Sequence, residues 1–317
     1  MEQQIQQILS IEYHFNVKTM SRLDGGFYDD ETYVMTSVDE HKYLVKYIRY
    51  KSTVEHLQLI LQFQNILHES YEYPCPKIIL SIHQQYVIQH DKRFLFVQTF
   101  IEGGIEPTKQ FLDENSSYFI EIGRLLAQWR IASRNFQFNL QRDQFEEFTD
   151  QWWKQQIDQN QQIHPFLLTN LIQCQQQLTN INQLFEWGLI HNDFHTNNSL
   201  ITNHRTISII DFIDAYRSVF IADLATSLFH LLIDQHQGIE RAKLFLQGYQ
   251  QILSLTSQEI QLIQPFVQLK LTLSIIQDLA ESVTENHPFI QSCFRLLHLL
   301  NEQSTFILSL FPHPQHV

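Results

Sequence analysis

The sequence predicts an α+β fold in two lobes, a small antiparallel-sheet lobe over residues 1–101 and a larger helical lobe over residues 102–317. Apolar and polar residues alternate at period two in several short runs of the first hundred residues. After Glu102-Gly103-Gly104 the spacing becomes helical and remains so. A chain of 317 residues is also longer than one hydrophobic core usually serves. Strands and helices do not alternate throughout, which excludes a doubly wound sheet.

The first lobe is predicted to hold a sheet with one inserted helix. Residues 1–16 carry apolar side chains at helical spacing and predict a short lead-in helix. Strand patterns follow at 17–23, 32–37 and 42–48. A helical stripe covers residues 54–69 and is ended by Tyr73-Pro74-Cys75-Pro76. Two further strand patterns lie at 86–90 and 94–100, joined by a turn at Asp91-Lys92.

The second lobe is predicted to be helical except for one stretch, Leu189 to Asp214. Helical patterns cover residues 116–133, 166–185, 221–234, 238–253, 257–281 and 288–310. Within the exceptional stretch, residues 198–202 and 206–211 are predicted to pair as a hairpin through a turn at 203–205. That pairing is expected to place Asn198 opposite Asp211.

Composition excludes several classes of protein. A formal net charge of −13 argues against a nucleic-acid binder, which needs cations to displace counterions from phosphates. Three distant cysteines indicate no disulfide framework. The polar N-terminus does not resemble a signal peptide, and no apolar run is long enough to span a membrane. We therefore expect a cytoplasmic protein without membrane or nucleic-acid partners.

Three polar residues of the exceptional stretch have the types needed for metal-assisted phosphoryl transfer. The oxygens of Asn198 and Asp211, meeting at the open end of the predicted hairpin, suit a hard divalent cation such as Mg²⁺. Asp193 lies five residues before Asn198, where its carboxylate can accept a proton from a hydroxyl. Without a metal, carboxylates repel a polyphosphate by about 4 kcal/mol per charge pair at roughly 4 Å and an effective dielectric near 20.

Lys46 is the expected counterpart in the first lobe. It is charged inside an otherwise apolar strand and shares a face with Leu44 and Ile48. A lysine so placed is expected to bind the α- and β-phosphates of a nucleotide. It also needs an orienting acceptor from the helix at 54–69. The candidates, among which the sequence does not choose, are Glu55, Gln64 and Glu69.

The run His191-Asn192-Asp193-Phe194-His195-Thr196-Asn197-Asn198, followed by Ile209-Ile210-Asp211-Phe212, resembles a family motif. The aminoglycoside phosphotransferase-like family, which includes choline, homoserine, hydroxylysine and aminoglycoside kinases, reads H-x-D-x-H-x-x-N and then hydrophobic-D-F/W. The resemblance implies a protein-kinase-like fold. It extends over nearly the whole chain, through Lys46, the hinge Gln98–Gly104, Ile122–Ala127 and Ala222–Ala225. Tyr28-Asp29-Asp30, Gln64-Asn65 and Asp211–Asp214 look most like the hydroxylysine-kinase branch.

The resemblance implies a role for each matched residue. Asp193 would be the catalytic base, and Asn198 and Asp211 would be the Mg²⁺ ligands. ATP or GTP would be bound by Lys46, Gln64, Gln98, Phe100 and Glu102. His191 and His195 would support the loop, and Asp223 would brace it by hydrogen bonds.

The chain departs from the family pattern in three places. Asn192 stands where Gly is usual and Thr196 where Pro is common, so the loop is expected to be somewhat altered. Residues 23–35 contain no G-x-G-x-x-G phosphate loop.

We therefore predict a Mg²⁺-dependent kinase that transfers the γ-phosphoryl group of ATP or GTP to a hydroxyl of a small, amine-bearing acceptor. The acidic chain fits a cationic acceptor. Asp278 or Glu281 could bind its ammonium and Trp152 with Trp153 could wall its pocket. A solvated helix end explains the two acidic residues better, and core packing or a lobe insertion explains the two tryptophans better.

Three other functions are weighed against this one. A catalytically weak, nucleotide-binding pseudokinase-type partner is the main alternative. A hydrolase with His191, Asp193 and His195 as metal ligands lacks a second ligand cluster. A protein kinase would need an A-P-E-like segment after Asp211.

Overall fold

The computed structural model describes residues 2–23, 31–49, 53–136, 148–160, 164–179, 181, 185–202, 205–234, 236–281 and 283–311. The motif Tyr28-Asp29-Asp30 and the turn residues Asn203 and His204 lie outside these ranges. The chain forms two compact units. Unit 1 comprises Met1–Pro107 and Asn197–Ile213, and unit 2 comprises Thr108–Thr196 and Asp214–Val317. Unit 1 thus extends to residue 107 and also contains residues 197–213; the lobe boundary after residue 101 stays a prediction.

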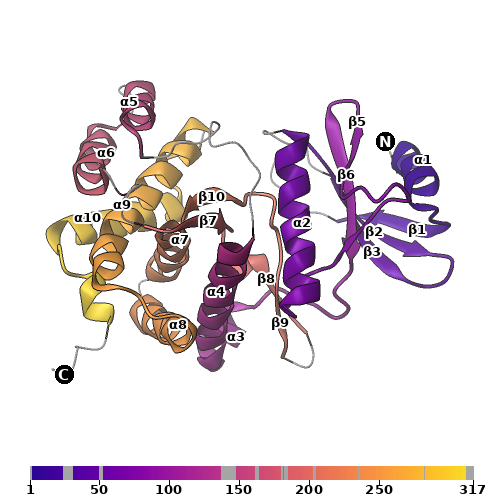
Figure 1. The fold of residues 1–317 in the computed structure, drawn as a ribbon. Helices are drawn as coiled ribbons and strands as arrows, with labels where there is room; N and C mark the ends of the chain where they lie inside the picture. The colour runs from indigo at the N-terminus through magenta and orange to yellow at the C-terminus, as the bar shows by residue number, and fades with distance from the viewer. Residues whose placement is uncertain are drawn as a thin grey trace. The chain divides into compact units, whose positions relative to one another are not determined.

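Unit 1 is built on an antiparallel sheet (Figure 1). The strands, in spatial order, are β1 (Val17–Arg22), β2 (Glu31–Ser37), β3 (Lys42–Ile48), β6 (Arg93–Thr99) and β4 (Ile78–Ile79), with β5 (Ile88–His90) also paired to β6. All strands predicted for this lobe are present. The two-residue β4 was not predicted, because two residues are too few to display a period.

Two helices cover opposite faces of this sheet. Helix α1 (Glu2–Tyr13) packs Leu9 into one core with Val45 of β3, whereas α2 (Val54–Ser70) packs Leu57 into another with Ile48. Alternate residues of a strand point to opposite faces, so Lys46 lies on the face that α2 covers. The sequence predicted this shared face of Lys46 and Ile48.

A short hairpin from the second half of the chain completes unit 1. It pairs β8 (Ser199–Ile201) with β9 (Ile207–Ile209) in a register that joins Ser199 to Ile209. The backbone oxygen of Asn198 accepts a hydrogen bond from the Ile210 nitrogen, at 3.0 Å. The prediction that Asn198 faces Asp211 was therefore wrong by one residue. The Thr202 nitrogen donates to the Thr206 oxygen at 3.1 Å, and counting back from this pair places Asn198 opposite Ile210. The second predicted strand was one residue longer than the first, so its last residue, Asp211, lies beyond the paired end.

Backbone hydrogen bonds attach the hairpin to the rest of unit 1. The nitrogen of Ile209 donates to the Pro74 oxygen at 2.8 Å, and Ile105 and Ile201 exchange two bonds of 3.1 and 2.8 Å. These bonds join segments about a hundred residues apart, which is why a hairpin that belongs by sequence to the helical half lies with the sheet unit.

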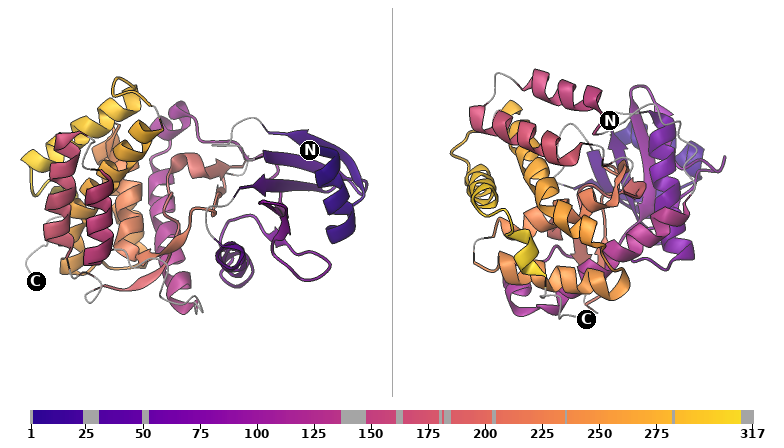
Figure 2. Two further views of the ribbon diagram at one scale, coloured as in Figure 1. Left: turned by 90° about the horizontal axis from the view of Figure 1, so that it is seen from above. Right: turned by 60° about the vertical axis from the view of Figure 1, so that its left-hand side comes forward.

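Unit 2 is helical around one short ribbon (Figures 1 and 2). Its helices are α3 (Lys109–Glu114), α4 (Ser117–Asn135), α5 (Asp150–Gln159), α6 (Pro165–Leu178), α7 (Phe220–Leu232), α8 (Gly238–Ile252), α9 (Ser257–Ala280) and α10 (Pro288–Glu302). The ribbon pairs β7 (Trp187–Ile190) with β10 (Tyr216–Val219). Helices α4 and α7 pack against β7.

The predicted helices of unit 2 are present with two corrections. The pattern at 166–185 ends as a helix at Leu178, and that at 288–310 divides into α10 and a separate 3₁₀ turn at Ile307–Leu310. Helix α3, helix α5 and the β7–β10 ribbon were not predicted. Helix α3 has only six residues and buries none of them, so it carries no apolar stripe.

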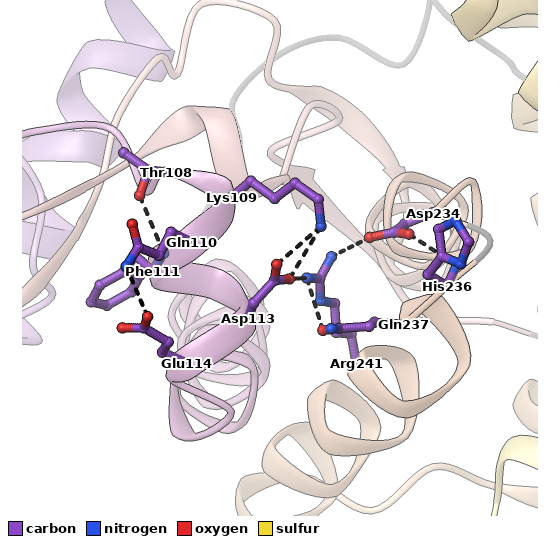
Figure 3. Close-up of polar contacts among 10 residues, drawn as sticks. All are labelled: Thr108, Lys109, Gln110, Phe111, Asp113, Glu114, Asp234, His236, Gln237 and Arg241. Atoms are coloured by element: carbon purple, nitrogen blue, oxygen red, sulfur yellow. Dashed lines mark hydrogen bonds and ion pairs between the residues drawn. The ribbon is translucent and has the colours of Figure 1, made fainter.

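The ion pairs of one buried arginine tie three segments of unit 2 together (Figure 3). Arg241 of α8 is buried, and its guanidinium pairs with Asp113 of α3 and with Asp234 just beyond α7. Its second terminal nitrogen also donates to Gln237 at 3.0 Å. A guanidinium presents several donors in a rigid plane, so one side chain can join three segments.

Helices α4 and α8 approach each other closely through two glycines. A Cβ on Gly248 would lie 1.9 Å from the Ile120 oxygen, and one on Gly123 would lie 2.0 Å from the Phe245 oxygen. Neither backbone oxygen can yield without separating the helices. Glycine at these positions is therefore required by interhelical distance.

Gly248→Ala is expected to destabilise the protein by about 1–3 kcal/mol, because overpacking outweighs the gain of roughly 1 kcal/mol in helix propensity. Urea unfolding measures the change. Gln247→Ala, at an exposed position of the same helix, is the matched control and should leave the midpoint nearly unchanged. Equal stability of the two variants would contradict the close approach.

Two sequence expectations concern the whole chain. Cys75, Cys174 and Cys293 are buried and free, as expected for a chain without a disulfide framework. Among the described residues, none of the helices combines the length and apolar character needed to cross a membrane.

Candidate active site

The loop that follows β7 is held by one buried carboxylate. Asp223, in the first turn of α7, accepts hydrogen bonds from the backbone nitrogens of His191 and Asn192, both at 2.8 Å. The side chain is almost inaccessible to solvent. Burial raises the pKa of Asp223 to about 6, against the two backbone bonds and the charge of Lys270, which lower it. Asp223 thus makes the contacts that the predicted bracing role needs.

Asp223→Asn is expected to destabilise the protein by about 1–3 kcal/mol, because an amide offers one acceptor oxygen and turns its NH₂ group toward the second backbone donor. Urea unfolding measures the loss. Asp158→Asn, an identical exchange at an exposed position of α5, serves as the control. A midpoint shift no larger than that of the control would argue against a bracing role.

Asn192 occupies a backbone position that ordinary residues rarely adopt. Its φ is 68°, in the left-handed region where glycine and asparagine are favoured. This explains how Asn can stand where the resembled family has Gly. The Asn192 Oδ1 atom accepts a hydrogen bond from Lys270 Nζ of α9 at 2.7 Å, and Lys270 also donates to the Tyr216 hydroxyl at 3.3 Å. The sequence did not single out Lys270.

His191 lies in the core of unit 2. It is fully buried, with its ring centroid 5.2 Å from that of Trp129 and 5.5 Å from that of Phe194. The indole nitrogen of Trp129 donates to the Leu189 oxygen at 2.7 Å. These contacts are those of a scaffold residue, and the supporting role of His191 stays a prediction.

Asp193 follows on this loop and is the most accessible of the charged groups there. Its side chain is 39% exposed, and Oδ1 lies 3.1 Å from Nε2 of His195. Burial alone would raise the pKa of Asp193, but the hydrogen bond to His195 and the charges of His195, His230 and His191 hold it well below its usual range. The carboxylate is therefore ionised at neutral pH and positioned by a histidine.

His230 is a neighbour that the sequence did not reveal. Its ring centroid lies 4.3 Å from that of His195, although 35 positions separate the two residues in the chain. His230 sits near the end of α7 within a strongly apolar run, so its pattern was that of a core residue. Only the packing of α7 shows that it belongs beside the loop.

In unit 1, the structure brings Lys46 and Asp211 together. Lys46 Nζ lies 2.6 Å from Asp211 Oδ1, and the two side chains are 13% and 37% exposed. Asp211 has a φ of 64°, a strained position of the kind that clusters at functional sites. Asn198 ends the 3₁₀ turn Thr196–Asn198 directly before β8, while Asp211 lies just beyond β9. Carboxylate and amide oxygens at this end of the hairpin fit a hard cation.

The predicted partners of Lys46 on α2 make other contacts. Gln64 Nε2 donates to the Pro76 oxygen at 2.8 Å and to Gln98 Oε1 at 3.3 Å. Glu69 pairs with Lys77, and Glu55 is exposed in the first turn of the helix. Asp211, which was not among the candidates, is the acceptor that Lys46 has in this structure.

The hinge residues predicted to contact a nucleotide differ in their surroundings. Gln98 is buried in β6 beside Gln64. The backbone nitrogen of Phe100 donates to the Lys42 oxygen at 3.4 Å, and the exposed Glu102 pairs with Lys42 at 3.2 Å. The structure thus joins Gln64 to Gln98, and Glu102 to Lys42. Their nucleotide contacts stay predictions.

The residues predicted to bind the acceptor have different surroundings. Trp153 is fully buried and packs edge-to-face on Trp152, with ring centroids 4.7 Å apart, which favours the core interpretation for Trp153. On α9, burial and the neighbouring Glu281 raise the pKa of Asp278. Glu281 accepts a hydrogen bond from Gln277 at 3.2 Å.

The kinase-like class of protein combines a sheet unit, a helical unit and a loop such as the one after β7, and this chain has all three. The chain matches the phosphotransferase enzyme family over residues 19–259, more than half of its length, and it belongs to that family. This confirms the predicted phosphotransferase class and family resemblance. No curated protein sequence matches the chain significantly.

Solved structures share the whole fold at low sequence identity. Amicoumacin kinase hAmiN, in complex with AMP-PNP, Ca²⁺ and Ami, has a TM-score of 0.73 at 19% identity, covering 98% of this chain and 94% of that one. The microcompartment-associated aminopropanol kinase has 0.71 at 18%, covering 98% of each chain. Choline kinase LicA from Streptococcus pneumoniae has 0.63 at 15%, covering 95% and 99%. These similarities confirm the predicted two-lobed kinase-like fold.

Proposed function

We propose that this chain is a kinase that uses ATP or GTP with Mg²⁺ to phosphorylate a hydroxyl group of a small, amine-bearing molecule. The observation that carries the proposal is the loop after β7 in a member of the phosphotransferase enzyme family. Its backbone is bound by Asp223, and it presents the ionised, accessible carboxylate of Asp193.

Asp193 is assigned to proton transfer. As the acceptor oxygen bonds to phosphorus, its hydroxyl becomes acidic and the proton passes to the Asp193 carboxylate. A carboxylate of low basicity suffices, since phosphoryl transfer has a loose transition state in which the hydroxyl acidifies late. The hydrogen bond to His195 fixes the direction of the carboxylate.

Asn198 and Asp211 are assigned to the metal, and Lys46 to the phosphates. A bound Mg²⁺ supplies charge neutralisation for the nucleotide phosphates. Lys46 and Asp211 already pair, so a nucleotide phosphate would offer Lys46 a second anion. The complex of hAmiN with AMP-PNP and Ca²⁺ supports a nucleotide and a divalent cation as the ligands proposed for this fold. Gln64, Gln98, Phe100 and Glu102 are proposed nucleotide contacts.

The acceptor is proposed to be a small cation with a hydroxyl. Aminopropanol and choline, named for two structural relatives, both combine a nitrogen with a hydroxyl. The net charge of −13 attracts a positively charged molecule at long range. Asp278 and Glu281, at the end of α9, remain the candidates for its ammonium group.

An assay for the release of nucleoside diphosphate tests the proposal. Amino alcohols, hydroxylated amino acids and aminoglycosides are offered with Mg²⁺ and ATP or GTP, and nucleoside diphosphate is measured. An active acceptor should yield a phosphomonoester visible by ³¹P NMR. Nucleotide binding without turnover on any acceptor would favour the pseudokinase-type partner, and absence of both would refute the proposal.

A further inference from the structure

Three side chains of unit 2 form a cluster with the composition of a metal site. Asp193, His195 and His230 each offer one ligand atom, and these atoms all lie within 4.8 Å of one another. We refer to them as the His–Asp cluster. Two members come from the loop after β7 and the third from α7. None of the three is assigned to Mg²⁺ in the proposed function.

The donor set favours a borderline transition metal over Mg²⁺. Two imidazoles and one carboxylate are common ligands of Zn²⁺, whereas Mg²⁺ prefers oxygen. Tetrahedral Zn²⁺ with bonds of about 2.0–2.1 Å holds its ligand atoms roughly 3.3 Å apart. Asp193 Oδ1 and His195 Nε2 are already 3.1 Å apart. Only the donor atom of His230 has to move closer for the three donor atoms to have the spacing that Zn²⁺ requires.

His230 can make that approach. Its ring lies beside that of His195, with 4.3 Å between centroids and 33° between planes. A small cavity borders both rings and is lined further by Ile122, Phe194, Thr196, Ser227 and Leu231. The 39% exposure of the Asp193 side chain gives an ion access from solvent.

The protonation states also suit a metal. A histidine binds metal through a neutral imidazole. Burial, with the charge of His195, lowers the pKa of His230 to about 3, although Asp193 opposes the shift. His230 is therefore neutral at physiological pH, and the ionised Asp193 supplies the negative charge.

We propose that Asp193, His195 and His230 form an inhibitory Zn²⁺ site. The ion would be bound by two imidazole nitrogens and one carboxylate oxygen, with water completing the tetrahedron. Zn²⁺ occupies the carboxylate oxygen that would otherwise accept the proton of the acceptor. The site itself is independent of the enzyme's activity, whereas its inhibitory effect rests on the proposed function.

Binding is tested first, without nucleotide or acceptor. The full chain, treated with a chelator, is titrated with Co²⁺, which shows intense visible absorption when four-coordinate, and the ion is then displaced by Zn²⁺. We expect one such site, weakened about 100-fold or more in His230→Phe, since even outer partners of a metal ligand contribute 10–100-fold. Phenylalanine keeps the ring and removes both nitrogens.

Two further variants complete the comparison. His230→Gln repeats the loss with a polar side chain, in case the aromatic variant folds poorly. His298→Phe is the matched control, because His298 is exposed, stacks on Phe166 and lies outside the His–Asp cluster. It should bind Co²⁺ and Zn²⁺ as the parent does. Unchanged binding in both His230 variants, or an equal loss in His298→Phe, would overturn the site.

Turnover is measured second, at saturating Mg²⁺ and nucleotide. Zn²⁺ should inhibit the parent and His298→Phe at concentrations that match the binding curve, and should inhibit His230→Phe only at concentrations about 100-fold higher. Equal inhibition of parent and His230→Phe would overturn the inhibitory role. If no acceptor supports turnover, the proposed function fails while the Co²⁺ titration still decides the site.

Discussion

Asp193→Asn is expected to lower kcat by about 10²–10⁴-fold, the usual contribution of a general base, with little change in nucleotide affinity. The amide has the shape of the carboxylate but cannot accept the proton of the acceptor hydroxyl. In free energy the loss is about 3–5 kcal/mol in the transition state. Steady-state kinetics with an active acceptor, together with nucleotide binding by calorimetry, measure the two quantities separately.

The control for this variant is Asp158→Asn, which removes one negative charge at an exposed position of the same unit. It should retain parental kcat, so that long-range charge effects are accounted for. Turnover that survives in Asp193→Asn would show that another group accepts the proton. A collapse of nucleotide affinity in that variant would instead place Asp193 among the nucleotide contacts.

Asp211→Asn is expected to lower kcat/KM by about 10³-fold or more and to raise the Mg²⁺ concentration needed for half-maximal activity. A metal ion contributes several kcal/mol of charge stabilisation in the transition state, and Asp211 is the charged member of its proposed ligand pair. A Mg²⁺ titration of turnover at fixed nucleotide measures both changes.

Lys46→Met separates this metal role from the ion pair. It breaks the same 2.6 Å contact between Lys46 and Asp211 while leaving the carboxylate in place. Nucleotide affinity should fall, and the Mg²⁺ midpoint should stay near the parental value. If Asp211→Asn and Lys46→Met shift the Mg²⁺ midpoint equally, Asp211 acts through the ion pair and not as a ligand.

Local patterns predicted most of the secondary structure. The strands of unit 1 and the long helices carry periods of two or 3.6 that burial on one face requires. Elements that bury little or are very short escaped prediction. Helix α3 has six residues with none buried, and β4 has two residues. The end of α6 was overextended, because an apolar pattern can continue past the last helical residue.

The hairpin illustrates what a local pattern leaves open. Both strands and the turn were predicted from residues 198–211, but the register was wrong by one position. Thr202 bonds to Thr206, which brings Ser199 opposite Ile209. The two predicted strands had five and six residues, so the last residue of the longer one extends past Asn198, and the side-chain pattern does not report where pairing stops. That the hairpin belongs to unit 1 likewise depends on its backbone hydrogen bonds to Pro74 and Ile105.

Lys46 shows, for a functional residue, the same difference between what a local pattern predicts and what only the fold determines. Its strand, its face and its need for an anionic neighbour followed from residues 42–48. The three candidate acceptors all came from α2, because neighbouring elements in the chain were the ones a sequence could compare. The acceptor in the structure is Asp211, 165 residues away, and only folding brings such a residue to β3.

By itself, the sequence determined the α+β class, the phosphotransferase family and the run of residues on which the proposed chemistry rests. These depend on residue type and on spacing along one segment, which a sequence contains in full. The tertiary structure alone decided the partner of Lys46, the two backbone nitrogens from which Asp223 accepts hydrogen bonds, and the place of His230 beside His195. Each is a contact between distant segments, and such contacts arise only when helices and strands pack.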